Sequence, residues 1–221
     1  GRYTLTLDER LLREIFEVSL TGLDYEPRYN IYPGSEVPVI VADGASSKKS
    51  ARLMRWGLIP RWAKGSSVGY KMINARAETV HQKPAYKKPF LSQRCLVPAD
   101  GFYEWQKHEG GKIPFRIVLP GEKPFSFAGL WDKWLSEEGT ELFSFTIVTV
   151  DANTWVKDIH DRMPVILDKN SQWDKWLNLN TSLEELQQLM TPYQGELISY
   201  KVSTLVNSPK NDFAALVEAV Q

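Results

Sequence analysis

Short segments of alternating apolar and polar residues recur along the chain, and this spacing predicts mostly β-structure. Between residues 94 and 150 the alternation is interrupted by Gly110-Gly111 and Pro120-Gly121, which are typical of turns between strands. The strands expected in this part of the chain are residues 95–97, 102–107, 114–119, 125–131 and 142–150. The second half of the chain is therefore expected to be built around a sheet.

The first sixty residues predict a strand, a helix and two further strands. Residues 1–7 alternate like a strand, and Asp8 is a plausible N-cap for a helix with an apolar face formed by Leu11, Leu12, Ile15 and Phe16. Residues 25–36 are rich in Pro, Gly and Asn and predict an ordered loop, in which Arg28, Tyr29 and Asn30 line a site. Strands are expected at 37–42 and 52–59, with the polar linker 43–50 as a disordered tip.

Helices are expected mainly near the end of the chain. Ser171 is predicted to cap a short helix containing Trp173 and Trp176, and Ser182 to cap a second helix through Met190. A late strand is expected at residues 197–202. Strands dominate, helices are peripheral and their order is irregular, so the sequence favours an α+β fold with one domain over residues 1–221.

Composition narrows the classes of protein. A chain of 221 residues that is 43% hydrophobic is long enough for one substantial core. It has no run approaching the ~18 apolar residues of a membrane span, and no leader, so we expect a cytoplasmic protein. Cys95 is the only cysteine and there are three histidines, so we expect neither a disulfide nor a metal or other cofactor. Nothing in the sequence requires a dimer, and a monomer is expected.

Positive charge is concentrated in one segment although the net charge is zero. Residues 48–94 contain twelve Lys and Arg residues against Glu78 alone, and they are interleaved with Trp56, Trp62, Tyr70, Tyr86 and Phe90. Cations follow phosphates and aromatic rings stack on bases, so the pattern indicates single-stranded nucleic acid as a partner. The alternative is a solvated face balanced in space by acidic residues at 132–141 and 184–185.

Three polar clusters, at residues 74–78, 100–105 and 158–164, carry the candidate chemistry. Glu104 stands between aromatic residues, which is expected to desolvate its carboxyl and raise its pKa toward a range useful in acid and base catalysis. His160 supplies an imidazole, the side-chain group that most often serves as an acid or base in catalysis. Together with the amide of Asn74, these side chains would form a reactive site if the fold brings them into one pocket.

The sequence resembles the SOS response-associated peptidase (SRAP) family. The motifs that carry the resemblance are Gly1-Arg2-Tyr3, residues 28–34, Trp56-Gly57-Leu58-Ile59-Pro60, residues 73–79, residues 100–105 and residues 159–164. The resemblance runs from the first residue to about Asn211. It implies a sensor of abasic sites in single-stranded DNA that shields the lesion by forming a covalent protein-DNA crosslink.

In that family the nucleophile is an N-terminal cysteine exposed by removal of the initiator methionine. Its α-amine and thiol add to the ring-opened sugar aldehyde and give a thiazolidine, and AP-lyase activity and self-processing of the methionine are further expectations. The printed chain begins at Gly1, so the resemblance places this cysteine directly before Gly1. Gly1 is accordingly counted with the catalytic group.

The resemblance also assigns roles to individual residues. Asn74 would hold the adduct, Glu104 would shuttle protons, and His160 would hydrogen-bond the opened sugar. The expected DNA-binding residues are the phosphate contacts Arg2, Arg76 and Arg162, the loop residue Asn30, the wedge Trp62, and the C-terminal residues Asn207, Lys210 and Asn211.

Two other classes of function stay open at this point. A non-covalent single-strand-binding module would use the basic and aromatic surface and have no need of Glu104 or His160. A cysteine peptidase acting through Cys95 would need His160 within hydrogen-bond reach of its sulfur. The apolar run 95–97 favours a buried, unreactive thiol instead.

Overall fold

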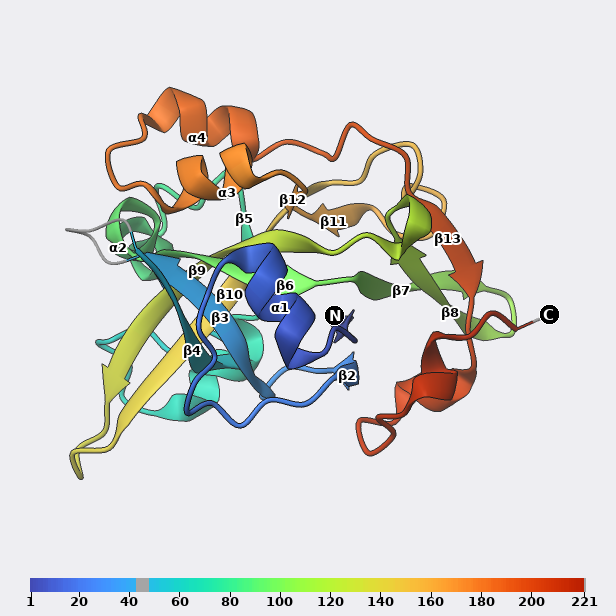
Figure 1. Cartoon of the computed structure of the whole chain (residues 1–221), viewed down its shortest axis with the longest axis horizontal. Helices are drawn as coiled ribbons and strands as arrows, with labels where there is room; N and C mark the ends of the chain where they lie inside the picture. Colours follow the sequence, from blue (N-terminus) through green and yellow to red (C-terminus); the bar gives the residue numbers. More distant parts are fainter. Residues whose placement is uncertain (43–47, 221) are drawn as a thin grey trace.

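Two β-sheets form the body of the protein, of which the computed structural model describes residues 1–42 and 48–220 (Figure 1). The first sheet has five strands in the order β13-β8-β7-β1-β2. Its strands are β1 (Arg2–Leu5), β2 (Arg28–Ile31), β7 (Gly101–His108), β8 (Gly111–Val118) and β13 (Ile198–Lys201). The strand formed by the first residues of the chain therefore lies inside the sheet, with a neighbour on each side.

The second sheet has eight strands in the order β11-β10-β4-β3-β6-β9-β12, with β5 also paired to β10. Its strands are β3 (Glu36–Ala42), β4 (Lys49–Trp56), β5 (Asn74–Arg76), β6 (Arg94–Ala99), β9 (Phe125–Leu135), β10 (Glu141–Asp151), β11 (Arg162–Pro164) and β12 (Ile166–Leu167). Because β9 also pairs with β10, the path from β10 through β4, β3 and β6 to β9 closes on itself like a barrel.

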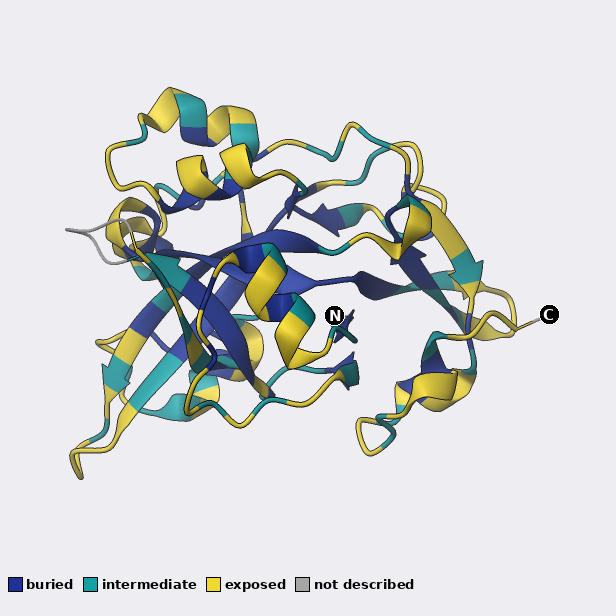
Figure 2. Cartoon of the chain, viewed as in Figure 1, coloured by how far each residue is buried: buried dark blue, intermediate teal, exposed yellow. Residues whose placement is uncertain are grey.

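The helices lie outside the sheets, and buried residues follow the central strands (Figure 2). The helices are α1 (Glu9–Phe16), α2 (Pro84–Ser92), α3 (Asn170–Leu177) and α4 (Leu183–Leu189), with 3-10 turns η1 (Ser66–Lys71), η2 (Pro120–Glu122), η3 (Thr204–Asn207) and η4 (Ala214–Val217). The Phe16 ring of α1 stacks on Trp173 of α3 with centroids 4.6 Å apart. A strand-rich α+β fold with peripheral helices is confirmed.

The capping signals identify two of the helix starts. Leu11 N–H donates to the Asp8 carboxylate at 2.8 Å, and Ser182 forms a reciprocal capping box with Glu185, as expected from both side chains. The cap predicted at Ser171 is wrong, because α3 already begins at Asn170 with Lys169 as its N-cap. The Gln172 side chain accepts from the Lys169 N–H at 3.2 Å and from the residue before it.

The loop expected at residues 25–36 is wrong in its centre, where Arg28–Ile31 forms β2 at the edge of the first sheet. The backbone N–H groups of Tyr29 and Asn30 donate to the Asp212 carboxylate at 2.6 and 3.0 Å. This carboxylate comes from 182 residues later in the sequence, so local turn chemistry could not reveal the partner. Residues 43–47 of the predicted linker lie outside the described residues, and residues 49 and 50 belong to β4.

The strand expected to run to Ile59 ends at Trp56 because of the glycine that follows. Gly57 has φ +120°, and its N–H donates to the Phe145 carbonyl at 2.8 Å. A β-carbon at Gly57 would lie only 2.6 Å from the carbonyl oxygen of Gly69. The chain therefore turns out of the sheet where only glycine fits.

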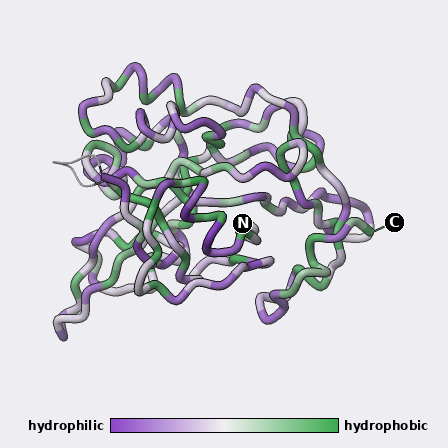
Figure 3. Tube along the Cα trace, viewed as in Figure 1, coloured by the Kyte–Doolittle hydropathy of each residue, from purple (hydrophilic) through white to green (hydrophobic). Residues whose placement is uncertain are grey.

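The sequence pattern did not predict β5, β11 or α2. The short strands β5 and β11 lie inside polar motifs, and α2 lies in the basic segment and contains Pro89. Hydrophobic and hydrophilic stretches are interspersed along the whole trace (Figure 3). Every helix in the described part of the chain is too short or too polar to cross a membrane.

We expect Gly57→Ala to lower the free energy of unfolding by at least ~2 kcal/mol, because it combines backbone strain with a clash against Gly69. Gly139→Ala is the matched control, since Gly139 also has a positive φ, +85°, but has no atom within 4 Å of an added β-carbon. Urea unfolding of both variants measures the difference. Equal losses in the two variants would contradict the close approach of residues 57 and 69.

Candidate functional site

The register of β1 decides where the N-terminus lies. Antiparallel pairing with β7 sets Arg2 opposite Tyr103 and Tyr3 opposite Phe102, so the next step of the register brings Gly1 opposite Glu104. The terminus lies near the centre of the molecule in Figure 1, whereas the C-terminus lies at its right edge. A paired strand thus carries the Gly1 amine into the middle of the fold.

A cavity of about 250 Å³ opens around this amine, between β1 and β7 of one sheet and β5, β10 and β11 of the other. Its wall includes polar side chains from four parts of the sequence. The lining residues are Gly1, Arg2, Tyr3, Trp56, Asn74, Arg76, Phe102, Tyr103, Glu104, Phe127, Ile147, Thr149, His160, Arg162, Met163 and Pro164. The structure therefore brings Gly1, Asn74, Glu104 and His160 together.

The Glu104 carboxyl and the Gly1 amine change each other's titration. Burial raises the pKa of the Glu104 carboxyl, and the positive charges of His160 and the N-terminus offset only part of the rise. Burial also lowers the pKa of the Gly1 amine, and the Glu104 carboxylate opposes this shift. Both shifts favour the uncharged forms, which are the forms that addition of an amine to a carbonyl uses.

His160 faces this pair from the loop before β11. Its Nε2 lies 4.0 Å from Glu104 Oε2, and its Nδ1 accepts the Arg162 N–H at 3.0 Å. Nδ1 also lies 3.1 Å from the Arg162 carbonyl oxygen and 3.2 Å from Asp161 Oδ1, so it has a hydrogen-bond partner in either tautomer, while Nε2 faces Glu104. The loop is anchored on β7, since the Gln106 side chain donates to the Asp158 carbonyl at 2.9 Å.

Asn74 and Arg76 enter the cavity wall from β5. This strand runs parallel to β10, with Asn74 opposite Ile147 and Arg76 opposite Thr149. Both side chains are exposed, and neither makes a hydrogen bond or ion pair to any other residue within 1–42 and 48–220. They are therefore free to contact a molecule in the cavity.

Arg162 differs from Arg76 in that its guanidinium is already held. It forms a two-pronged pair with Glu78, at 2.7 and 3.1 Å, and also binds Asp151 at 2.6 Å. It donates to the Thr149 carbonyl at 2.7 Å as well. This network ties β11 to β10 and to the residues after β5, and it braces the backbone N–H that orients His160.

Arg2 and Asn30, expected to contact DNA, hold the C-terminal segment against the first sheet. Arg2 Nη2 donates to the Asn207 carbonyl at 2.8 Å. The buried Asn30 amide donates to three carbonyls of the same segment, those of Val206, Ser208 and Asn211, at 3.2, 3.1 and 2.7 Å. Arg2 lines the cavity, whereas Asn30, Arg28 and Tyr29 do not, and the partner of Arg28 and Tyr29 is Asp212.

The remaining candidate DNA contacts lie outside the cavity wall. Trp62 is 63% exposed, and Lys210 is exposed too. Asn207 accepts the Trp105 indole N–H at 2.8 Å, and the Asn211 amide donates to the Leu205 carbonyl at 2.8 Å. Trp105 thus lies beside the C-terminal segment.

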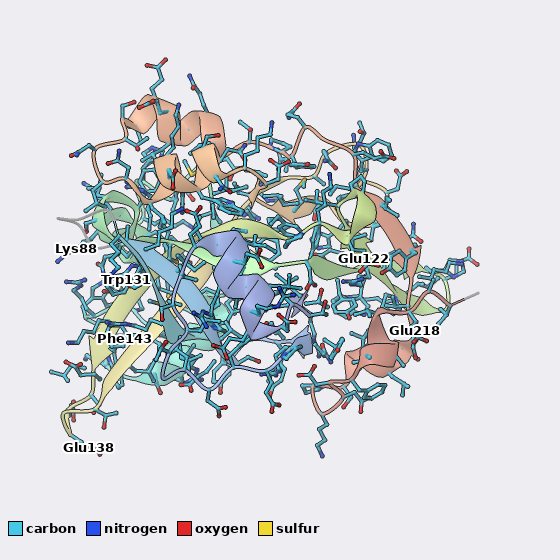
Figure 4. The ribbon with its side chains drawn as sticks, viewed as in Figure 1. Lys88, Glu122, Trp131, Glu138, Phe143 and Glu218 are labelled. Carbon is cyan, nitrogen blue, oxygen red and sulfur yellow. The ribbon has the colours of Figure 1, made fainter. Side chains whose placement is uncertain are left out.

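Part of the basic segment is balanced inside the molecule. Arg61 pairs with the buried Asp132 at 2.6 Å, Lys49 pairs with Asp174 at 2.9 Å, and the buried Arg94 donates to backbone carbonyls. Arg52 stacks on Phe143, which the β9-β10 hairpin carries together with Trp131 (Figure 4). The twelve positive charges are therefore not all available to a ligand.

Cys95 is fully buried on β6, and burial raises the pKa of its thiol well above the usual range. It does not line the cavity that contains His160. This position argues against a peptidase that uses Cys95 as its nucleophile. Among the described residues, no group of three or more His, Cys, Asp and Glu side chains is placed to hold a metal ion.

Sequence reasoning did not identify Trp56 and Thr149 as part of the cavity wall. Trp56 follows an apolar strand and precedes Gly57, which gives it the signal of a core residue. Thr149 lies within a nearly continuous apolar strand and has no motif around it. Both are brought to the site by pairing between distant strands.

Comparison with known proteins finds relatives over nearly the whole chain. The chain is 48% identical over 224 residues to the abasic site processing protein YoaM of Bacillus subtilis, covering 99% of this chain and 97% of that protein. It is 38% identical to the abasic site processing protein HMCES of Gallus gallus, covering 85% and 65%. A crystal structure of a protein from Bacteroides thetaiotaomicron superposes with a TM-score of 0.88 at 26% identity, over 100% of this chain and 99% of that one.

The family comparison covers the whole region of the site. A family model described as SOS response associated peptidase (SRAP) matches residues 1–209, which include every residue of the cavity wall. The chain belongs to the SOS response associated peptidase family.

Proposed function

We propose that this protein processes abasic sites in single-stranded DNA by forming a covalent bond between its N-terminus and the opened sugar. The observation that carries the proposal is the cavity itself, where β1 holds Gly1 opposite Glu104, near Asn74 and His160, and where burial raises the pKa of the Glu104 carboxyl. A cysteine joined to Gly1 would bring its α-amine into this cavity. The names of the relatives, abasic site processing proteins, supply the substrate class. An abasic sugar in its ring-opened form carries the aldehyde that such an amine attacks.

The proposed nucleophile is a cysteine joined directly to Gly1. Its neutral amine adds to the aldehyde carbon, and loss of water gives an imine. The thiol sulfur then adds to the imine carbon while the nitrogen takes up the thiol proton, which closes a thiazolidine ring. Two bonds to one carbon make the adduct persistent.

The side chains of the cavity fit separate parts of this reaction. Glu104 protonates the departing hydroxyl and later removes a proton, and burial, which raises its pKa, favours the acid form that donates. His160 donates from Nε2 to the sugar oxygen, and the free amide of Asn74 holds the adduct. Arg76 is the cavity cation without an internal partner in the described residues, and it neutralises a flanking phosphate.

Two further activities are proposed for the same cavity. An imine acidifies the sugar proton next to it, so a base can remove that proton while the 3′ phosphate leaves with the bonding electrons, which is lyase chemistry. Hydrolysis of the bond between an initiator methionine and the cysteine would expose the nucleophile. Glu104 and His160 are the groups available for proton transfer in both reactions.

A chain with Met-Cys placed before Gly1 is expected to form a heat-stable adduct with an abasic single-stranded oligonucleotide on a denaturing gel. Glu104→Gln should slow the adduct at least ~100-fold, because it removes the proton donor. Glu109→Gln is the matched control, since Glu109 is an exposed glutamate in the turn after β7. A chain that binds the oligonucleotide without any adduct would instead be a non-covalent binding module.

The chain that begins at Gly1 is expected to form only the imine, because it has no thiol next to its amine. Borohydride should trap a covalent product with abasic DNA, and peptide mapping should locate it on Gly1. Without borohydride we expect no persistent adduct and slow strand cleavage at the abasic site. Trapping on a lysine instead of Gly1 would contradict the assigned amine.

The titration of the Gly1 amine gives an independent measurement. Its pKa is expected to lie below the usual value of about 8, because burial disfavours the charged form. Glu104→Gln should lower this pKa further, since it removes a carboxylate that stabilises the charged amine. NMR of the chain carrying a ¹⁵N label at Gly1 measures both, and Glu109→Gln should leave the value unchanged. A higher pKa of the Gly1 amine in Glu104→Gln would contradict the electrostatic interaction between this amine and the Glu104 carboxylate.

A further inference from the structure

Trp56 joins the two parts of the cavity that the reaction must bring together. It is buried at the end of β4 and lies in the wall between the N-terminus and β5. Its indole N–H donates to the carbonyl of Ile73 at 2.9 Å. Ile73 directly precedes Asn74, so this bond fixes the backbone from which the Asn74 side chain extends.

The six-membered ring of the same indole lies against Gly1. A β-carbon built on Gly1 would lie 3.3 Å from Cη2 and 3.5 Å from Cζ2 of Trp56. The first distance is shorter than an ordinary van der Waals contact, so any larger residue would have to displace the ring or the N-terminus. Glycine at this position lets the terminus lie directly on the ring.

Trp56 has little freedom to move out of the way. Its backbone N–H donates to the Ser35 carbonyl at 2.9 Å, and its carbonyl accepts the Gly34 N–H at 2.8 Å. Its ring stacks on Phe145 with centroids 6.4 Å apart and meets Tyr3 edge to face at 5.3 Å. A β-carbon added at position 1 would therefore move the N-terminal residues more readily than it would move the Trp56 indole.

We propose that Trp56 is a positioning residue that sets the distance between the N-terminal nucleophile and Asn74, and that it selects glycine at position 1. The inference rests on the proposed function, because it assigns a role within that reaction. An alanine β-carbon at position 1 would require a shift of a few tenths of an ångström, and rates of reactions between held groups depend steeply on such displacements. Trp56 acts through the position of Gly1 and Asn74 and does not itself exchange protons.

The test uses the chain with Met-Cys before Gly1 and measures the single-turnover rate of adduct formation at saturating abasic DNA, together with DNA affinity. Gly1→Ala is expected to slow the rate about 10-fold with affinity unchanged. Trp56→Phe, which removes the N–H donor and shortens the ring, should also slow it about 10-fold. In the double variant, Gly1→Ala should reduce the rate of adduct formation much less than it does beside Trp56, because the shorter phenylalanine ring leaves room for the alanine β-carbon.

Trp134→Phe is the matched control. The Trp134 indole N–H also donates to a backbone carbonyl, that of Ala63, at 2.7 Å, but Trp134 does not line the cavity. It should lose similar stability while leaving the adduct rate unchanged. A purely structural role of Trp56 would make the two tryptophan variants alike.

Two results would overturn the inference while leaving the proposed function standing. One is an unchanged adduct rate in both Gly1→Ala and Trp56→Phe, and the other is a fully additive effect in the double variant. If Trp56→Phe does not fold, Gly1→Ala decides alone, since it leaves the indole bond intact. If the chain with Met-Cys forms no adduct, the proposed function fails. The titration of the Gly1 amine in the chain that begins at Gly1 then tests the contact between Gly1 and Trp56. The pKa of this amine should rise in Trp56→Leu, and an unchanged pKa would contradict the contact.

Discussion

The pairing of β1 between β7 and β2 is the constraint on which the site depends. A chain terminus usually frays, but here both edges of the first strand are occupied, and the register with β7 brings Gly1 opposite Glu104. The conformational entropy lost when the terminus is ordered is therefore offset by strand pairing in the sheet and not by ligand binding. The cysteine that we propose next to Gly1 would therefore be held in place before DNA binds.

The second sheet contributes the other polar side chains of the cavity wall. Its strands β5, β10 and β11 bring an amide, a free guanidinium and the imidazole loop to the same cavity, and Arg162 locks these strands together through Glu78 and Asp151. Because each acidic partner of Arg162 is itself partly exposed, the network contributes geometry more than stability. The site thus combines a buried acid and amine pair with a polar rim that is open to a polymer.

The sequence predicted the strand-rich class, two of the caps and the three polar clusters, because these are local patterns. It did not predict β2, whose N–H groups are bound by a carboxylate far along the chain, or β5 and β11, which are too short to show a period. Asn74, Glu104 and His160 were singled out by their neighbours in sequence, yet their meeting depends on strand order. Trp56 was missed because a buried aromatic next to glycine has the same pattern whether it packs a core or a cavity.

The residues around the cavity also divide the basic surface into two functional parts. Arg2 and Asn30 bind the carbonyls of residues 206–211, so they shape the segment that borders the site, and a phosphate at Arg2 would have to compete with those carbonyls. Arg76 has no such competitor within the described residues. Electrostatic attraction at the cavity therefore falls chiefly on Arg76, while Arg2 and Arg162 keep the walls in place. Cations that are already paired internally add structure to a nucleic-acid site without adding much affinity.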